Sequence, residues 1–202
     1  MNSRALRGQK LSEKYITPLL TSFLGARKIR QMSEQTSTTD IAEQGTKPLP
    51  EHAWLDRLVG NWRSEMTYRM GPDAPEGFAE GTETVRNFGG LWATGESVTK
   101  MSADVTMGSL WGIGYDVSAK GYRSSWIMSM SSHLWKGIGT LSEDGNTMTI
   151  DCVGPSMGDD DGTANYRDVI EIIDENHRTL TSFGEAPDGS FTEFMKVHYY
   201  RV

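Results

Sequence analysis

The stretch Leu58-Val59-Gly60-Asn61-Trp62 decides the fold, because it joins a short apolar helical turn directly to a strand that opens with a tryptophan. The helical turn is expected over residues 53–59. Gly60 can take the positive φ that ends such a turn, and its missing side chain lets the turn pack closely against the strand. Trp62 is therefore expected at the mouth of a barrel or the edge of a sandwich. The last strand-like run carries Arg201 near its end, and a guanidinium stacked on the Trp62 indole would join the first strand to the last.

From Trp62 onward the residues alternate with a period of two, which is typical of half-buried strands. Clusters of Gly, Asn, Asp and Pro recur at nearly fixed spacing, as hairpin turns require. They separate further strand-like runs at residues 79–88, 91–100, 105–117, 121–130, 133–142, 146–153, 166–174, 178–186 and 191–202. A meander this long must close on itself or leave exposed edges, and closure is the stable answer. The sequence predicts an all-β, antiparallel up-and-down barrel of about ten strands with a short N-terminal helical turn.

These motifs resemble known families at two levels. Gly60 and Trp62 in the first strand, with Arg201 near the last, are similar to the Gly-x-Trp and Arg of the calycin superfamily, which includes lipocalins and fatty-acid-binding proteins. More narrowly, the chain resembles an uncharacterised bacterial family catalogued as a domain of unknown function. The motifs that carry this resemblance are Leu58 to Trp62, Phe88-Gly89-Gly90-Leu91-Trp92, Leu110-Trp111, Gly114-Tyr115-Asp116, Trp126 and Tyr200-Arg201. The resemblance implies a lipocalin-like barrel and no particular activity.

The composition excludes several classes of protein. The net charge is −7, and residues 1–31 hold seven Arg or Lys against one acidic residue, so the rest of the chain is strongly acidic. An acidic body repels phosphate backbones, so nucleic-acid binding is not expected. Cys152 is the single cysteine, so no internal disulfide can form and secretion gains no support. No run approaches the roughly 18 apolar residues of a membrane span, and we expect a cytoplasmic protein.

The first fifty residues differ in composition from the rest of the chain. Residues 1–31 are basic with a broken apolar patch, whereas residues 33–50 are rich in Ser, Thr, Gln and Pro. Three readings of residues 1–31 stay open: upstream sequence before a start at Met32, a disordered extension, or a targeting segment. We expect residues 1–50 to form a disordered extension and residues 51–202 to form the barrel domain.

The period of two also predicts which side chains face inward. If Arg201 covers Trp62, then Glu193 and Tyr199 share the inner face of the last strand and His198 points outward. In the other strands the large faces are expected to point inward. Polar groups among aromatic ones are typical of a pocket that orients a small molecule. The candidate ligand-binding residues are Trp92, Glu96, Trp111, Tyr115, Trp126, Met128, Glu193 and Tyr199. A solid aromatic core with Met as gap filler is the alternative.

We expect the barrel to bind a small, mainly apolar molecule. An alternative is an acid–base lyase or isomerase that pairs Glu96 or Glu193 with Tyr115 or Tyr199, although a non-enzymatic role is favoured. Another alternative is a structural module with a filled core that forms a homodimer through the outer faces of its strands. No metal site and no cofactor are expected, because the four histidines are scattered and have no spaced partner ligands.

Overall fold

The computed structural model of the chain describes residues 46–71, 73–157, 162–186 and 188–202. Residues 47–202 form one compact unit. The expectation of a disordered extension over residues 1–50 falls mostly on residues 1–45, which lie outside the described residues.

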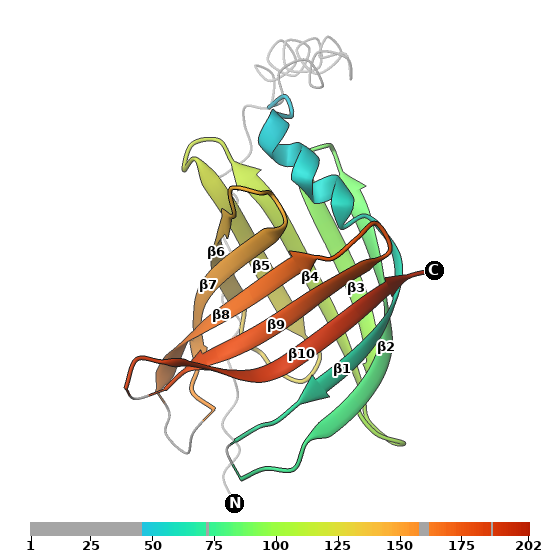
Figure 1. Ribbon diagram of the computed structural model, residues 1–202, viewed down its shortest axis with the longest axis vertical. Helices are drawn as coiled ribbons and strands as arrows, with labels where there is room; N and C mark the ends of the chain where they lie inside the picture. Colours follow the sequence, from blue (N-terminus) through green and yellow to red (C-terminus); the bar gives the residue numbers. More distant parts are fainter. Residues whose placement is uncertain (1–45, 72, 158–161, 187) are drawn as a thin grey trace, which may run out of the picture. The chain divides into compact units, whose positions relative to one another are not determined.

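Ten antiparallel strands of the described part close into one barrel (Figure 1). A short 3-10 helix, η1 (Pro50–Arg57), precedes them. The strands are β1 (Gly60–Tyr68), β2 (Gly77–Phe88), β3 (Trp92–Lys100), β4 (Thr106–Asp116), β5 (Gly121–Met128), β6 (Trp135–Leu141), β7 (Thr147–Pro155), β8 (Thr163–Ile172), β9 (His177–Glu185) and β10 (Phe191–Arg201). Each strand pairs with its neighbours in sequence, and β1 also pairs with β10. The predicted up-and-down barrel with a short N-terminal helical turn is confirmed.

The junction between η1 and β1 has the geometry that its sequence predicts. Gly60 has a φ of 147°, and a Cβ placed there would lie 2.1 Å from Nη1 of Arg201. A side chain at this position would be strained by the backbone conformation and would displace the Arg201 guanidinium. The indole Nε1 of Trp62 donates a hydrogen bond to the Leu58 carbonyl at 2.9 Å, which ties the strand back to the turn.

Arg201 closes the barrel at the same junction. It pairs with Trp62 in the register of β1 and β10, and its guanidinium carbon lies 4.2 Å from the centroid of the Trp62 ring. The guanidinium also donates hydrogen bonds to the carbonyls of Val59 at 2.6 Å and Glu175 at 2.8 Å. The predicted stack between the first and last strands is confirmed.

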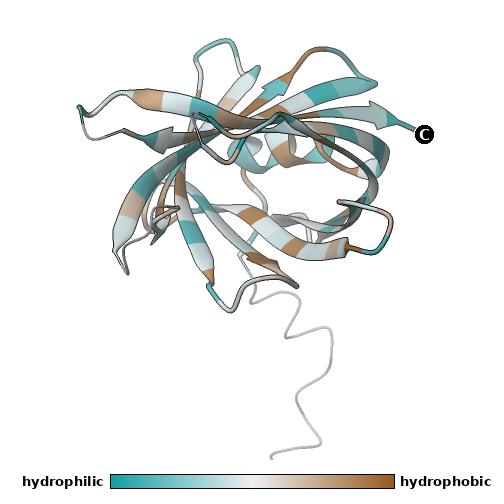
Figure 2. Ribbon diagram, turned by 90° about the horizontal axis from the view of Figure 1, so that it is seen from below, coloured by the Kyte–Doolittle hydropathy of each residue, from teal (hydrophilic) through white to brown (hydrophobic). Residues whose placement is uncertain are grey.

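The helix η1 lies across the end of the barrel from which β1 starts (Figure 1), and its residues close that end. Trp54 and Leu55 of η1 are buried, and Trp54 Nε1 donates to the Gly145 carbonyl in the turn between β6 and β7. The Tyr122 hydroxyl on β5 donates to the Glu51 carbonyl at 2.7 Å. Seen from the opposite end, the strands form a ring with η1 behind it (Figure 2).

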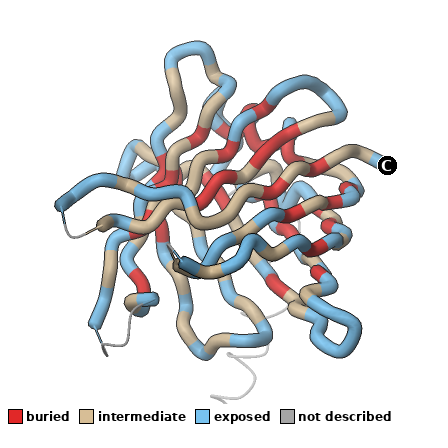
Figure 3. The backbone as a smooth tube through the Cα atoms, turned by 60° about the horizontal axis from the view of Figure 1, so that its bottom comes forward, coloured by how far each residue is buried: buried red, intermediate tan, exposed pale blue. Residues whose placement is uncertain are grey.

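Buried and exposed positions alternate along the strands (Figure 3), but burial differs between the two ends of the barrel. We call the inward-facing side chains next to η1 the capped half; Trp62, Val85, Ile113, Met148 and Ile170 in this half are buried, whereas Tyr115 is partly buried. We call the inward-facing side chains toward the other end the open half; Trp111, Trp126, Met128, Trp135 and Met195 in this half are partly exposed, whereas Tyr166 is buried.

Candidate functional site

Five of the eight candidate residues face the interior of the barrel. Trp111, Trp126 and Met128 belong to the open half. Tyr199 is buried at the border between the halves, where the Arg178 guanidinium carbon lies 3.9 Å from its ring centroid. Tyr115 faces inward in the capped half, where its ring contacts His52 of η1 at 5.7 Å and Tyr122 at 5.3 Å between centroids. The structure therefore brings Trp111, Trp126 and Met128 to one end and leaves Tyr115 at the other.

The expected inward orientation of Trp92 and Glu96 is wrong. Trp92 is 40% exposed and Glu96 is also exposed, whereas the alternate residues of β3, such as Ala93 and Gly95, are buried. The reason is a neighbouring side chain. The Trp111 ring of β4 lies across β3, and a Cβ at Gly95 would be 2.1 Å from its Cε2 atom. The inner face of β3 must therefore be the small one, and Trp92 packs outside against Gly114.

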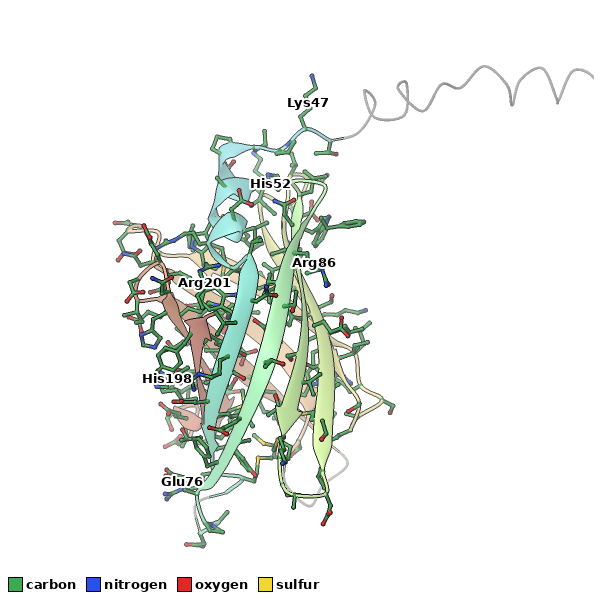
Figure 4. All side chains as sticks on the ribbon, turned by 90° about the vertical axis from the view of Figure 1, so that its right-hand side faces the viewer. Lys47, His52, Glu76, Arg86, His198 and Arg201 are labelled. Atoms are coloured by element: carbon green, nitrogen blue, oxygen red, sulfur yellow. The ribbon has the colours of Figure 1, made fainter. Side chains whose placement is uncertain are left out.

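The expected inward orientation of Glu193 is also wrong, because β10 contains an irregularity. The register with β9 shifts between Glu193 and Met195, which is the signature of a β-bulge. One extra residue reverses the inward and outward phase on its far side. Met195 and Tyr199 keep the inward phase that Arg201 sets, while Glu193 is exposed on the outside. His198 points outward as predicted, stacked on His177 with 5.3 Å between ring centroids (Figure 4).

A buried ion pair that the sequence analysis missed crosses the interior. Glu83 of β2 and Arg178 of β9 are each 3% exposed and form a salt bridge. Glu83 also accepts a hydrogen bond from Trp111 Nε1 at 2.8 Å. The Arg178 guanidinium lies between the rings of Trp62 and Tyr199, at 4.8 and 3.9 Å from their centroids. Such a pair is stable in a dry interior only because its members find further partners.

A period-two signal for Glu83 was present in the sequence, because it shares a phase with Ala79, Gly81 and Val85. No local signal marked Arg178 as its partner, since the two residues are 95 positions apart. Burial raises the pKa of the Tyr199 phenol, and the charge of Glu83 adds to this effect. The phenol is thus held in its neutral form.

An aromatic arc lines the inner wall of the open half. We define it as Trp126 of β5, Trp135 of β6, Tyr166 of β8 and Phe194 of β10. Successive ring centroids are 6.0, 5.1 and 6.1 Å apart. The intervening strand β7 carries Gly154, where a Cβ would lie 2.1 Å from the Trp135 ring, so a larger residue would break the arc. The arc offers π faces and edges to whatever occupies this end.

Polar groups stand among these rings. Ser97 and Ser109 share a hydrogen bond of 2.6 Å on β3 and β4. Asp168 of β8 accepts a hydrogen bond from Ser182 of β9, and burial raises the pKa of its carboxyl although this hydrogen bond opposes the shift. Cys152 also faces this region, and burial raises the pKa of its thiol to about 12, which makes it a poor nucleophile.

The described residues contain no group of three or more His, Cys, Asp or Glu side chains that could hold a metal ion. Among the same residues, no helix has the length and hydropathy needed to cross a membrane.

A closed up-and-down barrel, capped at one end and lined by aromatic and polar side chains at the other, is the class of protein that this fold and site define. The chain belongs to the family described as "Protein of unknown function (DUF1579)", whose model matches residues 47–201. The predicted membership of a family of unknown function is thereby confirmed.

A comparison with one solved structure supports the fold. The crystal structure of Rv2717c from M. tuberculosis is similar with a TM-score of 0.56 and 12% identity, covering 77% of this chain and 99% of that one. A redesigned β-barrel matches with a TM-score of 0.39 and 12% identity, covering 73% of this chain and 94% of its own. No curated protein matches the chain.

Proposed function

We propose that the protein binds a small, mainly apolar molecule inside the open half of the barrel. One observation carries the proposal: large aromatic and apolar side chains that point into a closed barrel, Trp111, Trp126 and Met128 among them, remain partly exposed to solvent. A filled core would bury them, as the capped half buries Trp62 and Ile113. Covering apolar surface that water now contacts is favourable, and a ligand of matching size would do so.

The acid–base alternative loses the pairs on which it was based. It required Glu96 or Glu193 beside an interior tyrosine, and both glutamates lie on the outside. The glutamate that does face inward, Glu83, is held by Arg178 and Trp111. A carboxylate held by these partners serves to stabilise the interior of the barrel and is not free to transfer a proton. We therefore propose binding and not acid–base catalysis.

Binding can be tested with the neutral fluorescent probe N-phenyl-1-naphthylamine, whose emission rises in apolar surroundings. Ser97→Phe places a ring inside the open half, and we expect it to weaken probe binding at least tenfold. Thr94→Phe adds the same ring to the exposed face of the same strand and serves as the matched control. Met128→Trp provides a second blocking variant if Ser97→Phe unfolds. Wild-type protein that leaves the probe emission unchanged would refute the proposal, as would equal losses in Ser97→Phe and Thr94→Phe.

A second candidate function, a homodimeric interaction module, is favoured by the outer face of β4 to β6. Leu110 and Ile127 are direct cross-strand neighbours and are 51% and 43% exposed. Ile138 nearby is 60% exposed and, with Trp92 and Leu134, lines an outer hollow of about 480 Å³. A second copy of the chain would cover these side chains. Light scattering should then report a dimer that Ile127→Glu converts to a monomer, whereas a wild-type monomer at high concentration would exclude it.

A further inference from the structure

The positive and negative charges of the side chains inside the barrel do not cancel. Among the described residues, three charged side chains face the interior between the two ends: Glu83, Arg178 and Asp168. The first two neutralise each other in the buried salt bridge. Asp168 forms none of the salt bridges of the described residues, and its one hydrogen bond comes from the Ser182 hydroxyl. When Asp168 is ionised, the interior therefore carries one uncompensated negative charge.

Asp168 faces the same space as the aromatic arc. It shares the inward phase of β8 with Tyr166, a member of the arc, and with Ile170. The register partner of Asp168 on β9 is Ser182. On the β7 side, Cys152 pairs with the neighbouring Tyr166, so the titratable group that faces Asp168 from β7 is a thiol. From β10 the neighbouring group is the neutral Tyr199 phenol. Asp168 is partly buried, and among the described residues only its Oδ1 accepts a hydrogen bond, so Oδ2 is left for a further donor.

We infer that the ligand is a small aromatic or lipophilic amine, bound with its ammonium group on Asp168 and its apolar body against the aromatic arc. This inference rests on the proposed function and specifies its ligand class. An ammonium donates up to three hydrogen bonds, and a carboxylate with a free oxygen accepts them. Aromatic faces also attract cations, and Tyr166 of the aromatic arc is the next inward-facing residue to Asp168 along β8.

The same charges disfavour the anionic ligands that lipocalin-like barrels suggest. A fatty acid or an aromatic acid needs a cation to pair with its carboxylate, but Arg178 already forms a salt bridge with Glu83. An entering carboxylate would meet Asp168 without a counter-ion, and burying like charges together is costly. A neutral molecule would fit the arc but would leave Asp168 without a partner.

The experiment is a titration calorimetry series with three probes that share one ring system: 1-naphthylmethylamine, 1-naphthylmethanol and 1-naphthylacetic acid. At pH 7.5 we expect the amine to bind at least tenfold more tightly than the alcohol, and the acid to bind most weakly. Asp168→Asn keeps the shape of the side chain and should weaken amine binding about tenfold while changing alcohol binding by no more than about twofold. Asp151→Asn is the matched control, since Asp151 is exposed on the outside of β7.

Each outcome of this series decides something. Tight amine binding that Asp168→Asn weakens about tenfold and Asp151→Asn preserves supports the inference. If the alcohol binds as well as the amine, or Asp168→Asn weakens both equally, the amine inference fails and the proposal of apolar binding stands. If none of the three probes binds the folded wild-type protein, both fail. If Asp168→Asn does not fold, Ser182→Ala tests the same site, because it removes the hydroxyl that orients the Asp168 carboxylate. The variant should then weaken amine binding and leave alcohol binding unchanged.

Discussion

The two halves of this barrel are built from the same strands but differ in how far their inward-facing side chains are buried. In the capped half, η1 lays Trp54 and Leu55 over a core in which Trp62, Ile113 and Met148 are almost completely buried. In the open half, Trp111, Trp126 and Met128 point inward but still contact solvent. One barrel can therefore bury its core at one end and leave inward-facing side chains exposed at the other, because a short helical element needs to fill only one end.

The buried salt bridge lies at the border between the halves, and breaking it should have the largest effect on stability. Arg178→Met leaves Glu83 as an uncompensated buried charge, which costs about 3 to 5 kcal/mol of unfolding free energy. The double variant Glu83→Gln with Arg178→Met should recover part of this loss. Urea unfolding monitored by circular dichroism measures both. If Arg178→Met were as stable as the wild type, the salt bridge would not contribute to stability at the border between the halves.

Arg201→Ala and Met128→Ala should affect the two halves differently, with effects on stability smaller than that of breaking the salt bridge. Arg201→Ala removes the stack on Trp62 and the hydrogen bonds to Val59 and Glu175, and should cost about 1 to 3 kcal/mol, or roughly 2 to 8 °C in Tm, without affecting probe binding. Met128→Ala should cost less than about 1 kcal/mol, because its side chain is already partly exposed, yet it should weaken probe binding.

Arg201→Lys is the conservative control for this contrast and should restore only part of the Tm, since an ammonium cannot stack flat on an indole. If Met128→Ala destabilised the protein as much as Arg201→Ala, the open half would be a filled core like the capped half, and the distinction between them would collapse.

The smallest effect is expected on the outer face, at His198 (Figure 4). Burial lowers the pKa of His198, and the neighbouring His177 and Lys196 lower it further. Protonation is therefore easier in the unfolded chain, so the stability that neutral His198 contributes is present above its ordinary pKa near 6.5 and is lost as the pH falls below it. Tm should fall modestly between pH 7.5 and pH 5, and His198→Phe should flatten that part of the profile. An unchanged profile in the variant would contradict this assignment.

The barrel could be predicted from the sequence, because the evidence for it is local. Alternation with a period of two, turn residues at regular spacing and the Gly60-Asn61-Trp62 junction are properties of neighbouring residues, and they predicted the ten-strand meander and the contact of Trp62 with Arg201. The inward position of Trp111 and Trp126 followed from this alternation together with the expectation that the larger face points inward, and that of Tyr199 followed from its phase with Arg201.

Only the tertiary structure decided which face of β3 points inward and which residues meet across the interior. Alternation defines two faces but does not say which is buried, and Trp92 was assigned to the wrong one because the Trp111 ring, from the next strand, occupies the space over Gly95. A single bulge before Met195 reversed the phase of Glu193. The pairing of Glu83 with Arg178 joins positions far apart in the chain, and closure of the barrel alone brings them together. Contacts of this kind depend on register and curvature, which are set by the whole sheet and by no single strand.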